Sequence, residues 1–149
     1  MAEACELPRE NASPEEIRAL LTRTQTIAVV GLSDKPDRPS FGVAEYMQRQ
    51  GYRIVPINPS ASEILGEKSY PDLRSAPGPF DMVNVFRKPE AVPEIVAEAI
   101  AVGAKSLWLQ EGVVHNEAAD QARAAGLAVV MDRCLLKEHR RCGLPARQS

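Results

Sequence analysis

Residues 27–43 read Ile27-Ala28-Val29-Val30-Gly31-Leu32-Ser33-Asp34-Lys35-Pro36-Asp37-Arg38-Pro39-Ser40-Phe41-Gly42-Val43. An apolar run ends at Gly31, a polar loop with two prolines follows, and a helix is expected to begin near Ser40. A buried strand that leads into a helix start directs free backbone N–H groups and the positive end of the helix dipole at one place. The segment therefore predicts a strand–loop–helix unit with a binding site for a phosphorylated ligand.

Apolar runs alternate with helical patterns along the rest of the chain. Unbroken apolar runs are typical of strands buried on both faces, and helices between them form right-handed crossovers. The predicted strands are residues 26–30, 52–57, 81–86, 106–110 and 127–131. The predicted helices are residues 14–23, 40–50, 89–102 and 116–125, the last with His115 as its other possible start. The pattern predicts an α/β fold with a parallel sheet.

The flanking segments differ from this alternating region. Residues 1–25 are interpreted as an N-terminal arm and helix, with residues 1–12 as a loose arm. Residues 26–139 form the predicted binding domain, in which residues 62–65 are a short helical or loop piece. Residues 140–149 are interpreted as a basic C-terminal tail.

Size, charge and cysteine content limit the class of protein. A chain of 149 residues has room for one core, and its net charge of −2 gives no reason to expect nucleic acid or an acidic membrane as a partner. No apolar run approaches the ~20 residues of a membrane span, and no signal-peptide apolar region is present near Met1. The scattered cysteines Cys5, Cys134 and Cys142 are typical of a reducing compartment. We therefore predict a cytoplasmic protein with a small-molecule ligand; a homo-oligomer or a protein partner is left open.

Ligands of an open parallel sheet bind beyond the carboxyl ends of the strands, where the strand order switches. Gly31 permits a tight turn and close approach of a ligand, and Arg38 offers a planar fork for phosphate. Lys35 is a second, more mobile cation, but it is better interpreted as a solvated loop charge. Ser40 is either a helix cap or a hydroxyl donor to phosphate, and Gly42 serves either helix packing or ligand approach. The other binding candidates near the strand ends are Leu32, Ser33, Pro39, Asn58, Pro59, Phe86, Arg87, Gln110, Gly112 and Cys134.

The loop does not match the fingerprint of a nicotinamide dinucleotide site. G-x-G-x-x-G places its glycines within six residues, but a long polar insert separates Gly31 from Gly42. The fingerprint also expects an acidic residue near the end of the second strand, where this chain has Asn58 and Pro59, and the next carboxylate, Glu63, lies past the turn. No Gly-Lys-Ser/Thr follows, as a Walker loop would need. An NAD(P)-dependent oxidoreductase domain is therefore kept only as the alternative function.

Seven short motifs, two of them within this loop, follow one another along the chain. They are Gly31-Leu32-Ser33, Arg38-Pro39-Ser40-x-Gly42, Gly51-Tyr52-Arg53-Ile54-Val55-Pro56-Ile57-Asn58-Pro59, Leu65-Gly66-Glu67-Lys68, Phe86-Arg87-Lys88-Pro89, Trp108-Leu109-Gln110-x-Gly112 and Met131-Asp132-Arg133-Cys134. Together they resemble the small bacterial CoA-binding protein family, built on the nucleotide-binding domain found at the start of the succinyl-CoA synthetase α subunit. The resemblance runs from about Thr26 to His139.

The resemblance implies a Rossmann-like, three-layer α/β domain with a five-stranded parallel sheet that binds coenzyme A. It implies that the phosphates lie at the loop after the first strand, that the adenosine end lies near Asn58 and Pro59, and that the ligand passes Phe86 and Arg87. Relatives often have a lysine after the second-strand turn, where this chain has Ser60-Ala61. The candidates that remain for a charge on the 3′-phosphate are Arg53, Lys68 and Arg87.

Catalysis would require a nucleophile beside a base. Cys134 follows Arg133, so it is either a reactive thiol, able to form a mixed disulfide with CoA, or a small packed residue. Cys134, His139 and Cys142 lack the spacing of a zinc site, and a Glu111–His115 acid–base pair is less expected than a turn followed by a helix start.

We predict no catalytic residue and no metal site. We expect the protein to bind coenzyme A or an acyl-CoA without turnover of its own, with the pantetheine arm directed toward Gln110, Gly112 and Cys134. Two further alternatives are an acyl-handling enzyme that uses Cys134 and a regulatory subunit that senses acyl-CoA.

Overall fold

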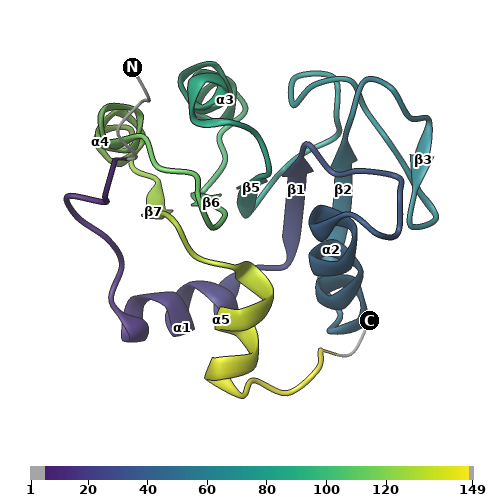
Figure 1. The fold of residues 1–149 in the computed structure, drawn as a ribbon, viewed down its shortest axis with the longest axis horizontal. Coiled ribbons are helices and arrows are strands. Elements are labelled where there is room, and N and C mark those ends of the chain that lie inside the picture. The colour runs from purple at the N-terminus through teal and green to yellow at the C-terminus, as the bar shows by residue number, and fades with distance from the viewer. Residues whose placement is uncertain (1–5, 148–149) are drawn as a thin grey trace.

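The computed structural model describes residues 6–147 and contains one five-stranded parallel sheet. Its spatial order is β2-β1-β5-β6-β7, and Figure 1 shows the strands side by side. The strands are β1 (Thr26–Val30), β2 (Arg53–Ile57), β5 (Met82–Val85), β6 (Ser106–Leu109) and β7 (Ala128–Val130). The α/β prediction is confirmed, and the strands after β1 are one to two residues shorter than predicted.

Helices cover both faces of the sheet, so the domain has three layers (Figure 1). The helices α1 (Pro14–Arg23), α2 (Pro39–Arg49) and α5 (Leu135–Cys142) pack on one face. The other face is covered by α3 (Val92–Ala101), which follows the short 3-10 helix η1 (Pro89–Ala91), and by α4 (Asn116–Ala124). Within the described residues, no helix is both long and apolar enough to cross a membrane.

Strand β1 illustrates why the central strands are apolar without interruption. Ile27 and Val29 pack in the core beneath α1, α2 and α5, while Ala28 and Val30 pack in the core beneath α3 and α4. Each face buries apolar surface, so a polar residue at any of these positions would need a buried partner. Trp108 obeys this rule: it is 0% exposed, and its indole Nε1–H donates to the carbonyl of Arg133 at 2.8 Å.

Residues 62–65 are not helical. They contribute β3 (Glu63–Ile64), which pairs antiparallel with β4 (Glu67–Lys68) in a two-stranded hairpin. The turn residues Leu65 and Gly66 both have positive φ, 56° and 77°. Two consecutive positive φ values are what a tight two-residue hairpin turn requires, so Leu-Gly at this place is the signal that the sequence interpretation missed.

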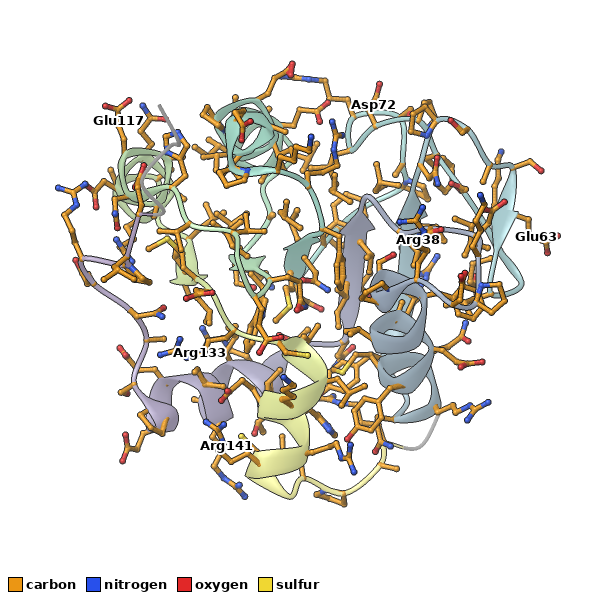
Figure 2. All side chains as sticks on the ribbon, viewed as in Figure 1. Arg38, Glu63, Asp72, Glu117, Arg133 and Arg141 are labelled. Atoms are coloured by element: carbon orange, nitrogen blue, oxygen red, sulfur yellow. The ribbon has the colours of Figure 1, made fainter. Side chains whose placement is uncertain are left out.

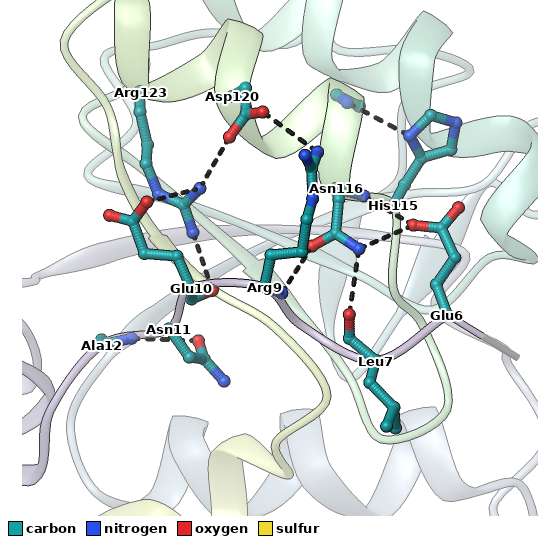
Figure 3. Close-up of polar contacts among 11 residues, drawn as sticks. Glu6, Leu7, Arg9, Glu10, Asn11, Ala12, His115, Asn116, Asp120 and Arg123 are labelled. Atoms are coloured by element: carbon teal, nitrogen blue, oxygen red, sulfur yellow. Dashed lines mark hydrogen bonds and ion pairs between the residues drawn. The ribbon is translucent and has the colours of Figure 1, made fainter.

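The N-terminal arm is packed rather than loose, at least from Glu6 onward; residues 1–5, including Cys5, lie outside the described residues. Asn116 donates from its backbone N–H and from Nδ2 to Glu6 Oε1, at 3.0 and 2.9 Å, and these bonds lower the pKa of Glu6 despite some desolvation. The side chain of Asn11 forms two hydrogen bonds with the backbone of Met131: Oδ1 accepts from the N–H at 3.0 Å, and Nδ2 donates to the carbonyl at 2.8 Å. Figure 3 shows how the arm lies along α4, with Glu6 and Leu7 bonded to Asn116. The prediction failed because each partner lies more than 100 residues away in the sequence.

The C-terminal segment also packs on the domain. Helix α5 buries His139, which is 2% exposed and whose Nδ1 lies 2.8 Å from the Tyr46 hydroxyl. The guanidinium of Arg147 lies 4.6 Å from the ring centroid of Tyr52, and its backbone N–H donates to the carbonyl of Gln50 at 2.7 Å. The predicted tail is therefore fixed to the domain up to Arg147.

This packing predicts a pH-dependent stability. Burial lowers the pKa of His139 below its ordinary 6.5, and the charge of Arg147 lowers it further. As pH falls below about 6.5, the unfolded chain takes up a proton that the folded protein resists, so stability present above that pH is lost toward the folded-state pKa. Urea denaturation across this pH range should show the loss, and His139→Phe should show a flatter profile. Identical pH profiles for the two proteins would contradict this role of His139.

Candidate functional site

The strand order switches direction between β1 and β5. The chain leaves β1 toward α2 on one face of the sheet and leaves β5 toward η1 and α3 on the other. A crevice forms at such a switch point, and it is the usual ligand site of an open α/β sheet. Here Gly31, which follows β1, and Phe86, which follows β5, both line a hollow at this point.

Three hollows open along this edge of the sheet. The loop hollow, of about 380 Å³, is lined by Gly31, Ser33, Lys35, Arg38, Pro39, Ser40 and Phe86. The β2 hollow, of about 710 Å³, extends from Gly31 past the turn after β2 to α3. The apolar hollow, of about 550 Å³, extends from Pro39 and Phe86 to Cys134. The hollows share lining residues, Gly31 and Phe86 among them, so they adjoin one another, and the three together are called the trough below.

Most of the predicted binding residues line this trough. Leu32 is fully buried and Gly42 lies outside the three linings, on the first turns of α2. The members that do line it are Gly31, Ser33, Arg38, Pro39, Ser40, Asn58, Pro59, Phe86, Arg87, Gln110, Gly112 and Cys134.

Backbone donors in the loop hollow divide into used and free groups. The amide of Gly31 donates to the carbonyl of Ile57 at 3.1 Å, and that of Ser33 donates to Ser40 Oγ at 3.0 Å. Within residues 6–147, two amides have no protein acceptor: that of Ser40, which lines this hollow, and that of Asp34, which follows the lining residue Ser33. The free amide of Ser40 belongs to the first turn of α2, where the helix dipole is positive. The loop therefore offers donors to an anion, although fewer than a fully open cradle would.

Ser40 is not the helix cap. Helix α2 begins one residue earlier, at Pro39, and Arg38 occupies the N-cap position without a side-chain capping bond. Proline suits the first helical position because its missing N–H would have no partner there. The hydroxyl of Ser40 instead accepts from Ser33, which closes the loop, and its own O–H remains available to a ligand.

Cationic side chains gather at the trough without acidic partners. Lys35, Arg38, Arg87 and Lys88 line its walls, and none of the four forms an ion pair within the described residues. Figure 2 shows Arg38 on the loop between β1 and α2. In a chain of net charge −2, unpaired cations at one crevice favour an anionic ligand with more than one charged group.

Gly31 is required by the protein itself. Its φ is +87°, and a Cβ at this position would lie 2.5 Å from the carbonyl oxygen of Phe86. The sequence interpretation assigned this glycine to a tight turn and to close approach of a ligand. The positive φ agrees with the turn, and the nearest obstacle to a side chain is the neighbouring strand end. Gly42 differs, because a Cβ there would meet no protein atom within 4 Å.

Asn58 joins the loops after β1 and β2. Its Nδ2 donates to the carbonyl of Leu32 at 2.8 Å, and its Oδ1 accepts from the amide of Ser60 at 2.7 Å. Both ends of the side chain are therefore occupied, and Asn58 positions the wall of the β2 hollow. Arg74, Asp72, Glu94 and Glu98 also line this hollow, and the sequence interpretation named none of them.

The apolar hollow ends at a polar floor. The side chains of Gln110 and Asn84 lie 3.2 Å apart, and Asn84 Nδ2 is fully buried without a partner. The amide of Gly112 donates to Asp132 Oδ1 at 2.7 Å, so it is not free for a ligand. Cys134, at the N-cap position of α5, lines the wall with a half-buried side chain.

The structure does not bring together the residues of the proposed acid–base pair, Glu111 and His115, or of a metal site within the described residues. Glu111 pairs with Lys137, 3.0 Å from Oε2 to Nζ, whereas His115 Nδ1 caps α4 by accepting from Ala118 at 3.1 Å. Residues 6–147 contain no group of three His, Cys, Asp or Glu side chains placed to hold a metal ion.

Comparisons with known proteins identify the family of this chain. The family model described as CoA binding domain matches residues 25–140, so the chain belongs to the CoA-binding domain family and the resemblance is confirmed. It is 43% identical over 130 residues to the uncharacterized protein YneT of Bacillus subtilis, covering 87% of this chain and 96% of that protein. A hypothetical protein from Pyrococcus horikoshii OT3 has a similar structure, with a TM-score of 0.87, 39% identity, and coverage of 97% of this chain and 100% of that one.

A larger enzyme contains a related segment. The ADP-forming acetate–CoA ligase II of Archaeoglobus fulgidus is 32% identical over 83 residues, which are 54% of this chain and 12% of that enzyme. The chain is therefore similar to a segment of this ligase and spans a small part of its length.

Proposed function

We propose that the protein binds coenzyme A, free or acylated, along the trough at the carboxyl edge of its sheet. The observation that supports this most is that three hollows with different chemistry adjoin one another along this edge. A ligand with an adenosine, a diphosphate and a long, weakly polar arm needs three such regions in a row.

Each part of the ligand has a place in this proposal. The adenosine lies in the β2 hollow, because the ribose of a nucleotide lies beside the end of the second strand in such folds. The diphosphate lies in the loop hollow, against the free amides of Asp34 and Ser40 and the side chains of Lys35 and Arg38. The pantetheine arm lies in the apolar hollow and directs its sulfur toward Gln110 and Cys134.

The proposed role is that of a cytoplasmic binding or regulatory module without turnover of its own. Gly112 contributes shape rather than a donor, because its amide is already bound to Asp132. Leu32 acts indirectly, through its carbonyl that holds Asn58. Gly42 lies outside the three hollows, and a Cβ there would meet no protein atom, so it is given no direct contact with the ligand.

Native mass spectrometry tests the ligand class. The purified protein is mixed with equal concentrations of CoA, acetyl-CoA and NAD, and the masses of the complexes are recorded. We expect one CoA or acetyl-CoA per chain and no NAD. Preferential retention of NAD would support the dehydrogenase alternative instead, and an acyl adduct on Cys134 would support acyl transfer. No retention of CoA at millimolar concentration would refute the proposal.

A further inference from the structure

The β2 hollow contains a cation that no sequence motif marks. Arg74 lies between the hairpin and β5, and its Nε is 3.8 Å from Glu98 Oε2 on α3. The backbone around it is fixed, because Leu73 is fully buried and the amide of Ser75 donates to Asp72 Oδ1 at 2.8 Å. The side chain itself is 60% exposed, so its guanidinium can reach a ligand without disturbing the core.

The other candidates for a charge at this end of the ligand are placed less well. Arg53 is the first residue of β2, so it lies at the end of the strand opposite to the trough. Lys68 lies over the ring of Tyr70, with Nζ 5.3 Å from the centroid, and does not line the hollow. Arg87 does line it, but its Cδ is only 3.1 Å from the position of a Cβ on Gly31, which places it at the diphosphate end.

The chemistry of the ligand makes a cation necessary here. A phosphate ester on the ribose has close to two negative charges at neutral pH, and a guanidinium binds phosphate through parallel N–H groups. The hollow also contains the carboxylates Asp72, Glu94 and Glu98. Burial raises the pKa of Glu98, and the neighbouring charge of Asp72 raises it further, so this region already resists added negative charge.

We propose that Arg74 binds the 3′-phosphate of coenzyme A, and that Glu98 holds Arg74 in the unliganded protein and competes with that phosphate for it. This inference rests on the proposed function. It adds the residue that selects CoA, which has a 3′-phosphate, over 3′-dephospho-CoA. The carboxylates of the hollow make the selection depend on Arg74, because they would repel the phosphate if the guanidinium were absent.

Calorimetric titration with CoA and with 3′-dephospho-CoA tests the assignment. We expect the wild-type protein to bind CoA roughly 10-fold or more tightly than 3′-dephospho-CoA, as a charge-assisted contact provides. Arg74→Gln should abolish or reverse this ratio and leave the affinity for 3′-dephospho-CoA unchanged. Glu98→Gln should increase the ratio, since the competing carboxylate is gone. Arg53→Gln removes an equal charge from the far end of β2 and should preserve the ratio.

The outcomes separate the two proposals. Equal wild-type affinity for the two ligands, or an Arg74→Gln variant that weakens both by the same factor, would overturn the role of Arg74 and leave CoA binding intact. Failure of the wild-type protein to bind either ligand would overturn the proposed function and this inference together.

Discussion

Gly31→Ala is expected to lower the free energy of unfolding by about 2–5 kcal/mol. The left-handed backbone at φ +87° would cost an alanine roughly 1–2 kcal/mol, and crowding in a packed region costs roughly 1–3 kcal/mol more. The crowding is severe because the obstacle is the backbone carbonyl of Phe86, 2.5 Å from the new Cβ, which cannot rotate away as a side chain would. Urea denaturation followed by circular dichroism measures the loss.

Two other glycines provide matched controls. Gly66 has φ +77° and no neighbour within 4 Å, so Gly66→Ala should show the backbone cost alone. Gly42 has neither a positive φ nor a neighbour, and Gly42→Ala should stabilise α2 by about 0.5–1 kcal/mol. Equal losses for the Gly31 and Gly66 variants would show that the contact with Phe86 is harmless. A stability defect in Gly31→Ala also means that weakened ligand binding by this variant would not by itself locate the ligand.

The layered fold could be predicted because its signal is local. Runs such as Ile27–Val30 and the helical patterns between them specify buried strands and crossovers without knowledge of their partners. The errors arose where a distant contact decides the structure. The arm is held by Asn116 and Met131, and the C-terminal segment by Gln50 and Tyr52, and nothing near either segment in the sequence reports these contacts.

The candidate site could be predicted in outline for a related reason. Topology alone brings the residues after β1, β2, β5, β6 and β7 to one edge, so a list of strand ends already names most of the trough. The roles of individual groups within the trough could not be predicted from the sequence. Ser40 closes a loop instead of capping a helix, and the backbone amide of Gly112 already donates to Asp132. Arg74 was missed because it follows a hairpin rather than a sheet strand, and a single arginine in a loop has no local pattern.

Removal of the Arg38 side chain should produce the largest loss of ligand affinity. Arg38→Ala should weaken CoA binding by about 10- to 150-fold, which corresponds to the roughly 1.5–3 kcal/mol of a hydrogen bond to a charged group. The fold should tolerate the change, because α2 uses only the backbone carbonyl of Arg38, which accepts from the amides of Phe41 and Gly42. Isothermal calorimetry measures the affinity, and an unchanged melting temperature shows that the variant is folded.

Two further variants show whether the contact depends on the planar guanidinium of Arg38, on its charge, or on the net charge of the protein. Arg38→Lys keeps the charge but loses the planar pair of donors, so it should recover only part of the lost affinity. Arg53→Ala removes an exposed cation from the opposite end of β2 and should leave CoA binding unchanged. If Arg38→Ala binds CoA as tightly as the wild-type protein, the diphosphate does not lie in the loop hollow. If Arg53→Ala weakens binding equally, net charge rather than a defined contact attracts the ligand. The expected order of affinity, wild type above Arg38→Lys above Arg38→Ala, is what an arginine in direct contact with a phosphate group should give.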